Sequence, residues 1–256
     1  MTELVRVEIH DGVMSITLNR PDKMNALNLA MYQALADAFI QADQDPVVRA
    51  ILLTGSDTCF TSGNDVSDFL ERDAMQGNNP VQQFMFALFE ARKPVIAAVT
   101  GPAIGIGTTL LLHCDLVYVS RDAKLQMPFV RLGVCPEFGS SKILTRRLGA
   151  TRAAQLLLLG ETFSGEQAAA WSLANECLGN AEATLEKARE SAKQFANLPP
   201  QAVIDSKALM KGPDREALRE VILKESELFA KRLKSPEAVE ALNAFLERRT
   251  PDFSKC

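Results

Sequence analysis

The sequence has few of the residues that build metal centres or disulfide frameworks. Its 256 residues include five widely spaced cysteines without a Cys-x-x-Cys pair, and only two histidines. An odd number of unclustered cysteines is typical of free thiols in a reducing compartment. Zinc sites need grouped Cys and His ligands or a His-Glu-x-x-His helix. We therefore expect free thiols and no metal site.

Long apolar runs and blocks of positive charge are also missing. No apolar stretch approaches the roughly 20 residues of a membrane-spanning helix, and the N-terminus lacks the pattern of a secretion signal. Lysine and arginine number 28 against 32 aspartates and glutamates, a net charge of -4, whereas nucleic-acid-binding domains carry basic patches. We expect no membrane or nucleic-acid partner and a bacterial-like cytoplasmic location. A peroxisomal location is disfavoured because the last residue of Ser254-Lys255-Cys256 departs from the SKL address.

The N-terminal part alternates strand and helix patterns. Apolar and polar residues alternate on both sides of Asp11-Gly12, which is typical of a β-hairpin over 5–9 and 14–18. Short apolar runs predict buried strands at 47–54, 94–99 and 116–119. Helical spacing predicts helices at 31–42, 82–91 and 108–113. The strand and helix alternation predicts an α/β protein.

From residue 151 onward the pattern is mostly helical. Ser164 and Gln167 form a capping box, and Ser235-Pro236 is typical of a helix start. Apolar positions over 218–233 predict one long helix. We therefore expect an α/β core over 1–195 and a helical C-terminal region over 196–256. The polar, Gly- and Asn-rich stretch 74–80 predicts a mobile loop.

Two glycine-containing turns follow predicted strands, FTSGND at 60–65 and GPAIGIG at 101–107. Each can present a backbone N–H to a ligand, the second at a helix start where donors are unsatisfied. Two such donors on one oxygen would form an oxyanion hole. For the stretch 60–65 the alternative is an ordinary strand-exit turn in which Asp65 caps a helix. For the stretch 101–107 the alternative is close packing between a strand and a helix. Leu110 replaces the third glycine of a dinucleotide fingerprint, which disfavours a nucleotide-binding α/β protein.

Glu137 stands among apolar residues in the stretch VCPEFG. In an apolar pocket the pKa of such a carboxyl would be raised, which suits proton transfer near neutral pH. The alternative, which the local sequence favours, is a turn glutamate at the start of a helix over 140–148. Cys135 has no histidine nearby in sequence to activate it, so we interpret it as a small buried residue. We interpret His113 as a core histidine.

Several ordered motifs together resemble the crotonase family, the enoyl-CoA hydratase/isomerase superfamily. They are LNRP at 18–21, NAL at 25–27, FTSGND at 60–65, AVTGPAIGIG at 98–107, HCDLVYVS at 113–120, GETFS at 160–164 and SPEAVEALNAFLERRTPDF at 235–253. The resemblance implies a spiral of ββα units with a helical C-terminal trimerisation region. It implies a homotrimer or a dimer of trimers that acts on acyl-CoA thioesters. Coenzyme A is then part of the substrate, and no separate cofactor is expected.

The resemblance also assigns the site residue by residue. It places the oxyanion donors on the backbone N–H groups of Asn64 and Ile106, so that each side chain is free to vary. It implies a substrate-binding surface made of Lys23, Met24, Asn25, Ala26, Ser62, Gly63, Asp65, Gly105, Phe129 and Leu132. Lys23 would lie near the phosphates of coenzyme A.

The acids distinguish branches of the family. Hydratases that resemble this chain use two glutamates, whose positions are occupied here by Thr109 and Phe129. The stretches SGND, GPAIGI, PF at 128–129 and the Glu137 loop instead resemble the peroxisomal-type Δ3,Δ2-enoyl-CoA isomerase branch, in which a single glutamate works alone. We therefore expect an enoyl-CoA isomerase with Glu137 as its base. The alternatives are hydration by one glutamate, thioester hydrolysis, or a non-catalytic acyl-CoA binder.

Overall fold

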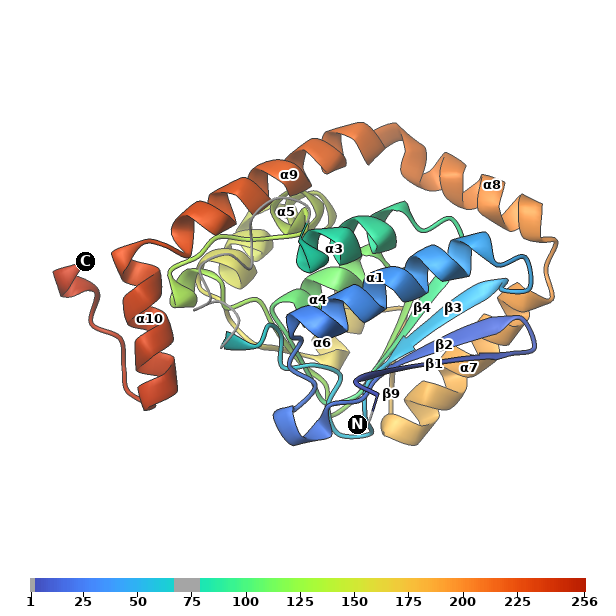
Figure 1. The fold of residues 1–256 in the computed structure, drawn as a ribbon, viewed down its shortest axis with the longest axis horizontal. Coiled ribbons are helices and arrows are strands. Elements are labelled where there is room, and N and C mark those ends of the chain that lie inside the picture. Colours follow the sequence, from blue (N-terminus) through green and yellow to red (C-terminus); the bar gives the residue numbers. More distant parts are fainter. Residues whose placement is uncertain (1–2, 67–78) are drawn as a thin grey trace.

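A computed structural model describes residues 3–66 and 79–256 of the chain. These residues form a six-stranded sheet in the order β1-β2-β3-β4-β6-β9 and a three-stranded sheet in the order β5-β7-β8. Helices cover both faces of the larger sheet (Figure 1). Of the loop that we predicted over 74–80, residues 74–78 lie outside the described residues.

The larger sheet begins with the predicted hairpin. Strands β1 (Val5–His10) and β2 (Val13–Leu18) pair antiparallel around Asp11 and Gly12, both with positive φ. The other strands pair parallel and are β3 (Ala50–Thr54), β4 (Val95–Val99), β6 (Leu116–Ser120) and β9 (Glu176–Leu178). The strand predicted from position 47 begins only at Ala50, because Val48 N–H closes a turn onto Asp45 O.

The smaller sheet was not predicted. It consists of β5 (Pro102–Ile104), β7 (Lys124–Gln126) and β8 (Phe163–Ser164). Strand β5 lies inside the stretch 101–107, which we interpreted only as a break before a helix. Strands β8 and β9 likewise correct the helical interpretation after residue 151. Strands of two or three residues carry no periodicity, so only their long-range pairing defines them.

The core also contains six described α-helices and three 3₁₀ turns. They are α1 (Leu29–Gln44), α3 (Pro80–Glu90), α4 (Ile106–Thr109), α5 (Ser140–Leu158), α6 (Gly165–Ala170) and α7 (Ala181–Ala196), with 3₁₀ turns η1 (Pro21–Lys23), η2 (Leu110–His113) and η3 (Val130–Leu132). Helices α1 and α3 cover one face, and α7 covers the other (Figure 1). The helix predicted over 108–113 begins at Ile106 and tightens into η2, because Gly105 takes the N-cap position.

The C-terminal region forms an arm over the core. Its helices are α8 (Pro200–Lys211), α9 (Arg215–Arg232) and α10 (Pro236–Glu247), with 3₁₀ turns η4 (Gly212–Asp214) and η5 (Phe253–Lys255). Helices α8 and α9 arch over the side that carries α1 and α3 (Figure 1). The predicted caps at Ser164 and Ser235 are present. Among the helices in the described part of the chain, none is both long and apolar enough to span a membrane.

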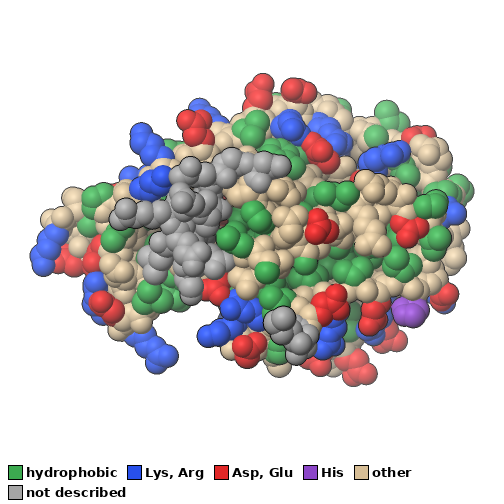
Figure 2. Space-filling view, in the orientation of Figure 1, with side chains coloured by type: hydrophobic (Ala, Val, Ile, Leu, Met, Phe, Trp, Pro, Cys, Tyr) green, Lys and Arg blue, Asp and Glu red, His purple; other side chains and the backbone are tan. Residues whose placement is uncertain are grey.

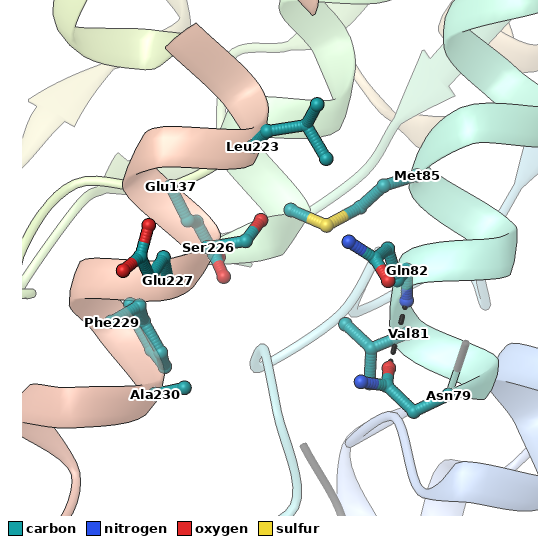
Figure 3. A pocket seen from close by; sticks show the side chains of 10 residues that line it. All are labelled: Asn79, Val81, Gln82, Met85, Glu137, Leu223, Ser226, Glu227, Phe229 and Ala230. Atoms are coloured by element: carbon teal, nitrogen blue, oxygen red, sulfur yellow. Dashed lines mark hydrogen bonds between the residues drawn. The ribbon is translucent and has the colours of Figure 1, made fainter. Parts of the chain in front are cut away.

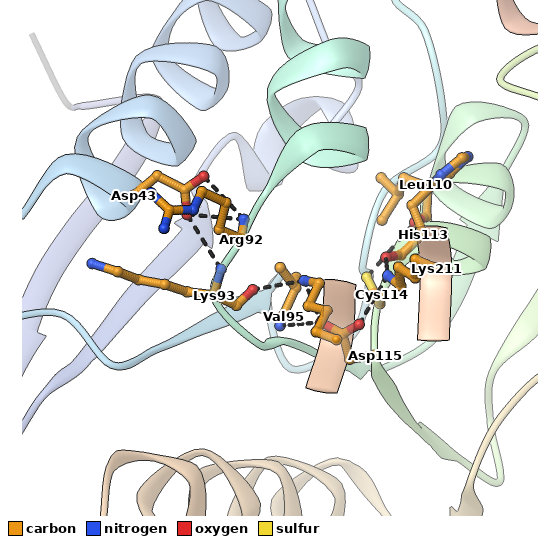
Figure 4. A network of polar contacts seen from close by, with 10 residues as sticks. Asp43, Arg92, Lys93, Val95, Leu110, His113, Cys114, Asp115 and Lys211 are labelled. Carbon is orange, nitrogen blue, oxygen red and sulfur yellow. Dashed lines mark hydrogen bonds and ion pairs between the residues drawn. The ribbon is translucent and has the colours of Figure 1, made fainter. Parts of the chain in front are cut away.

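A partly buried polar network connects α8 to the larger sheet. Asp115 lies just before β6 and forms ion pairs with Lys207 at 2.6 Å and Lys211 at 2.8 Å. The same carboxylate accepts the backbone N–H of Val95 at 2.8 Å, at the start of β4 (Figure 4).

On the face shown in Figure 2, positive and negative side chains are interspersed.

Candidate functional site

The two predicted oxyanion turns lie side by side. Thr61 pairs with Ala103 of β5 in a parallel bridge, and Ile104 N–H donates to Thr61 O at 3.0 Å. The N–H groups of Phe60 and Thr61 both donate to Pro102 O at 3.1 Å. The stretch 60–65 therefore extends the edge of β5, a relation that spacing in the sequence does not reveal.

Two glycines permit this close approach. Gly63 has a φ of 95°, and a Cβ there would lie 2.8 Å from the carbonyl oxygen of Ile104. A Cβ on Gly107 would lie 2.5 Å from Thr61 Cγ2. Side chains at either position would push the two turns apart. Close packing thus explains Gly107, whereas Gly63 sets the direction of the backbone that follows it.

The backbone N–H groups of Asn64 and Ile106 have no protein acceptor among the described residues; Asn64 lines the cavity described next, whereas Ile106 is fully buried. Leu27 N–H bonds Gly63 O at 2.8 Å and Asp65 N–H bonds Leu27 O at 2.9 Å, which leaves the Asn64 N–H between them unused. Ile106 opens α4, so its N–H has no partner within the helix. Within residues 3–66 and 79–256, neither group donates to a protein acceptor. The side chain of Asn64 is held separately, because its Oδ1 accepts from Tyr32 OH.

A cavity of about 580 Å³ lies beside these turns. Nine of the predicted site residues line it, namely Lys23, Ala26, Ser62, Gly63, Asn64, Asp65, Gly105, Phe129 and Leu132. Leu242, Phe245 and Leu246 of α10 also line it, and the sequence analysis missed them. Arg20 fixes the mouth, since its guanidinium pairs with Asp65 at 2.6 Å and donates to Ala26 O at 2.9 Å.

Met24 and Asn25 do not line this cavity. Met24 is 52% exposed, with a positive φ. Asn25 is fully buried and donates to the carbonyl oxygens of Cys59 at 3.0 Å and Phe60 at 3.1 Å. Asn25 therefore braces the turn that carries Lys23 against the oxyanion stretch.

Glu137 is a buried acid in a second cavity. It is only 3% exposed, which excludes the solvated turn glutamate that the local sequence favoured. The cavity measures about 250 Å³ and is lined by Glu137, Asn79, Val81, Gln82, Met85, Leu223, Ser226, Glu227, Phe229 and Ala230. Side chains of α9 face those of α3 across it (Figure 3).

The carboxyl of Glu137 is poised to hold a proton. Among the described residues, its Oε1 has no hydrogen-bond partner. Burial, and then the charge of nearby Glu225, raise the pKa of Glu137 to about 8. A carboxyl with such a pKa exchanges a proton readily near neutral pH.

Helix α9 connects the two cavities. Phe229 lines both of them. Its ring meets that of Phe129 edge-on, with 6.4 Å between ring centroids. The cavity of Glu137 and the cavity beside the stretch 60–65 thus share the side chain of Phe229, and sequence spacing gave no sign that α9 contributes.

The other titratable candidates are inert. Cys135 is only partly buried, not buried as we had interpreted it. This burial first, and the charge of Glu225 second, raise the pKa of its thiol to about 11, so the reactive thiolate is disfavoured. His113 is buried, and burial lowers its pKa to about 3. Its Nε2 lies 2.7 Å from Phe138 O, where the neutral ring donates. The prediction of a core histidine is confirmed.

Known proteins share this architecture along the whole chain. A model of the enoyl-CoA hydratase/isomerase family matches residues 8–255. The 2,3-dehydroadipyl-CoA hydratase of Escherichia coli is 32% identical over 254 residues, which cover 99% of both chains. Enoyl-CoA delta isomerase 2 of Rattus norvegicus is 33% identical over 252 residues, which cover 96% of this chain and 64% of the rat protein.

The same likeness holds in three dimensions. The solved structure of Pseudomonas aeruginosa OdaA superposes with a TM-score of 0.95 at 57% sequence identity, and the match covers 96% of this chain and 100% of that one. Relatives at similar identity are named both as hydratases and as isomerases, so similarity alone does not select the reaction. The chain belongs to the enoyl-CoA hydratase/isomerase family, the crotonase superfamily.

Proposed function

We propose that this chain is a Δ3,Δ2-enoyl-CoA isomerase, which shifts the double bond of a 3-enoyl-CoA to the 2-position. The observation that carries the proposal is Glu137, a buried carboxyl in a cavity wall with a raised pKa and an Oε1 that has no hydrogen-bond partner among the described residues. One such group suffices for an isomerisation, because the proton removed from one carbon returns to another.

In the proposed reaction the ionised Glu137 takes a proton from C2 of the substrate. The electrons of that C–H bond move into a dienolate whose negative oxygen is held by the N–H groups of Asn64 and Ile106. Glu137 then returns the proton to C4, and the double bond is left between C2 and C3. Each oxyanion donor contributes about 2.7–4 kcal/mol to such transition states in other enzymes.

The surroundings favour isomerisation over hydration. The positions that resemblance gives to the hydratase glutamates hold Thr109 and Phe129, both buried. Thr109 Oγ1 donates to Ile106 O at 3.4 Å, and Phe129 presents only a ring. Neither can activate water as a carboxylate does. The buried ring of Phe129 in the cavity wall would help to keep water away from the dienolate.

The remaining expectations belong to the same proposal. Lys23 lines the mouth of the larger cavity, where a coenzyme A phosphate would meet its charge. Coenzyme A arrives as part of the substrate, so no separate cofactor is required. A homotrimer or dimer of trimers and a cytoplasmic location also remain part of the proposal.

The test follows the ultraviolet absorbance of the conjugated thioester. A 3-enoyl-CoA should give rising absorbance with the wild type, and Glu137→Gln should lower the rate by about 10²–10⁴-fold, the usual contribution of general acid–base catalysis. Falling absorbance from a 2-enoyl-CoA, through hydration, would contradict the proposal. So would a lack of turnover with either substrate, which would favour thioester hydrolysis or a binding role.

A second variant examines whether one acid works alone. Glu227 lines the Glu137 cavity but is exposed. Glu227→Gln should change the isomerase rate by less than about tenfold, below the usual contribution of a general acid or base. A loss as large as that of Glu137→Gln would instead indicate two-acid chemistry.

A further inference from the structure

A second buried glutamate lies directly behind the loop of the proposed base. Glu225 of α9 is 8% exposed. One of its carboxylate oxygens accepts Gly139 N–H at 2.5 Å, and the other accepts Ser141 N–H at 3.1 Å and the Ser141 hydroxyl. These three donors lie at the start of α5, immediately after Glu137. A helix from the C-terminal region thus binds the backbone that carries the base.

The backbone between the two glutamates is strained. Phe138 has a φ of 56° and Gly139 a φ of 73°, so two successive residues are left-handed. For a residue with a side chain this conformation costs about 1–2 kcal/mol. His113 holds Phe138 from the other side, because its Nε2 donates to Phe138 O at 2.7 Å and its ring stacks on the phenyl ring at 3.8 Å. The turn is clamped between α9 and η2.

The two glutamates have opposite environments. Three hydrogen bonds on Glu225 favour its ionised form, although burial still raises its pKa above the ordinary value. Glu137 lacks such donors on Oε1 within the described residues. Among the described residues, other titratable groups near this loop are the Cys135 thiol, neutral His113 behind Phe138, and exposed Glu227 across the cavity. The charge of Arg232 acts on Cys135, and those of Lys211 and Arg147 act on His113. No cation is present among the described residues that line the cavity.

We propose that Glu225 is a positioning residue for the base: it holds the 137–141 backbone in its strained turn and places a fixed negative charge behind Glu137. This role rests on the proposed function of Glu137. Glu225 reaches neither reacting carbon in this role; it acts through the peptide groups of Gly139 and Ser141 and through the effect of its charge on Glu137. A cation or a neutral residue at position 225 would leave the base with a different proton affinity.

The experiment compares Glu225→Gln and Glu225→Ala with Glu220→Gln. The last variant removes one charge from an exposed position of α9 that lines neither cavity. The carboxyl of Glu137 is titrated by infrared or ¹³C spectroscopy on glutamate-labelled protein, and its signal is assigned by its absence in Glu137→Gln. The titration needs no substrate, so it is independent of the isomerase assay.

We expect Glu225→Gln to move the Glu137 titration about one pH unit lower, because a nearby negative charge is removed. The ascending limb of kcat/KM against pH should move by the same amount, and Glu220→Gln should leave both in place. Glu225→Ala should lower kcat at least about tenfold with little change in KM, because a displaced base slows the chemical step without weakening substrate binding.

The outcomes separate the two proposals. An unchanged Glu137 titration in folded Glu225→Gln would overturn the role of Glu225, even if the isomerase assay succeeds. A shifted titration in a protein without isomerase activity would support the coupling and reject the proposed function. If circular dichroism shows that the alanine variant is unfolded, Glu225→Gln takes its place in the kinetic arm.

Discussion

Asp115 and Glu137 are both largely removed from water, yet their surroundings are opposite. Asp115 has Lys207, Lys211 and the N–H of Val95 around its carboxylate. Burial alone would raise the pKa of Asp115, but the two lysines hold that pKa below its usual value. Glu137 has no cation among the described residues that line its cavity, so burial first and the charge of Glu225 second raise its pKa to about 8. Burial therefore does not determine the role of an acid; its partners do.

The difference separates Asp115, an acid that stabilises the fold, from Glu137, the acid that is the base in the proposed function. Asp115 converts its charge into stability by tying α8 to the sheet (Figure 4). Glu137 is kept in a setting that opposes its charge, which costs stability whenever it ionises. Acids with such perturbed pKa values cluster at functional sites.

Removing the charge of Asp115 should have the largest effect on stability of the changes considered. Asp115→Asn leaves Lys207, largely buried, without a counter-charge, so we expect unfolding by urea to require about 3 kcal/mol less free energy than in the wild type. Glu137→Gln should not lower the free energy of unfolding at neutral pH, because it removes an unpaired buried acid. Equal destabilisation by both substitutions would show that the two sites are alike.

The pH dependence of stability should have opposite signs at the two acids. The pKa of Glu137 rises from 4.5 in the unfolded chain to about 8 in the folded one. Its favourable contribution is complete below the unfolded pKa and is lost as the pH rises toward 8, at up to about 1.4 kcal/mol per pH unit. Asp115 has a lowered pKa, so its contribution is present above the unfolded value of 3.8 and is lost at lower pH.

Urea unfolding across this range measures both contributions. Relative to the wild type, Glu137→Gln should flatten the fall in stability between pH 4.5 and 8, and Asp115→Asn should flatten the loss in more acidic buffer. A wild-type slope that survives in Glu137→Gln would assign the effect to another group.

A smaller change tests how much each of the two lysines contributes to the pairing of Asp115. Lys207→Met removes one of the two cations but leaves Lys211 on the other oxygen of Asp115. We expect a destabilisation of about 1 kcal/mol, well below that of Asp115→Asn, because the carboxylate keeps a partner. Thermal unfolding of the two variants side by side measures the ratio. A larger effect from Lys207→Met than from Asp115→Asn would show that Lys207 contributes mainly through its bond to Lys93 O.

Local patterns in the sequence predicted the elements whose signals are local. The hairpin around Asp11-Gly12 and the caps at Ser164 and Ser235 follow from neighbouring residues alone. The oxyanion turns were identified as candidates, but their meeting depends on β5, whose three residues gain order only by pairing with β7. A short strand of this kind has no periodicity to detect.

The surroundings of Glu137 were beyond local reasoning. The apolar neighbours suggested a buried acid, but its position before a helix favoured a surface turn, which the burial of Glu137 shows to be wrong. Glu225 stands far along the chain between Lys224 and Ser226, in a stretch that is typical of a charged helix face. Only the packing of α9 onto the start of α5 turns that charge inward.

The position of α9 has a consequence for how this chain could be recombined with its relatives. Phe229 lines both cavities, and Glu225 accepts a hydrogen bond from the loop that follows Glu137. Replacing the residues after 196 would therefore change the cavity walls and the surroundings of Glu137. If Glu225 acts as proposed, a chimaera that takes its C-terminal segment from a relative inherits that relative's influence on the acidity of Glu137. Exchanging the C-terminal segment would therefore change the pH optimum, even though Glu137, Asn64 and Ile106 would still come from this chain.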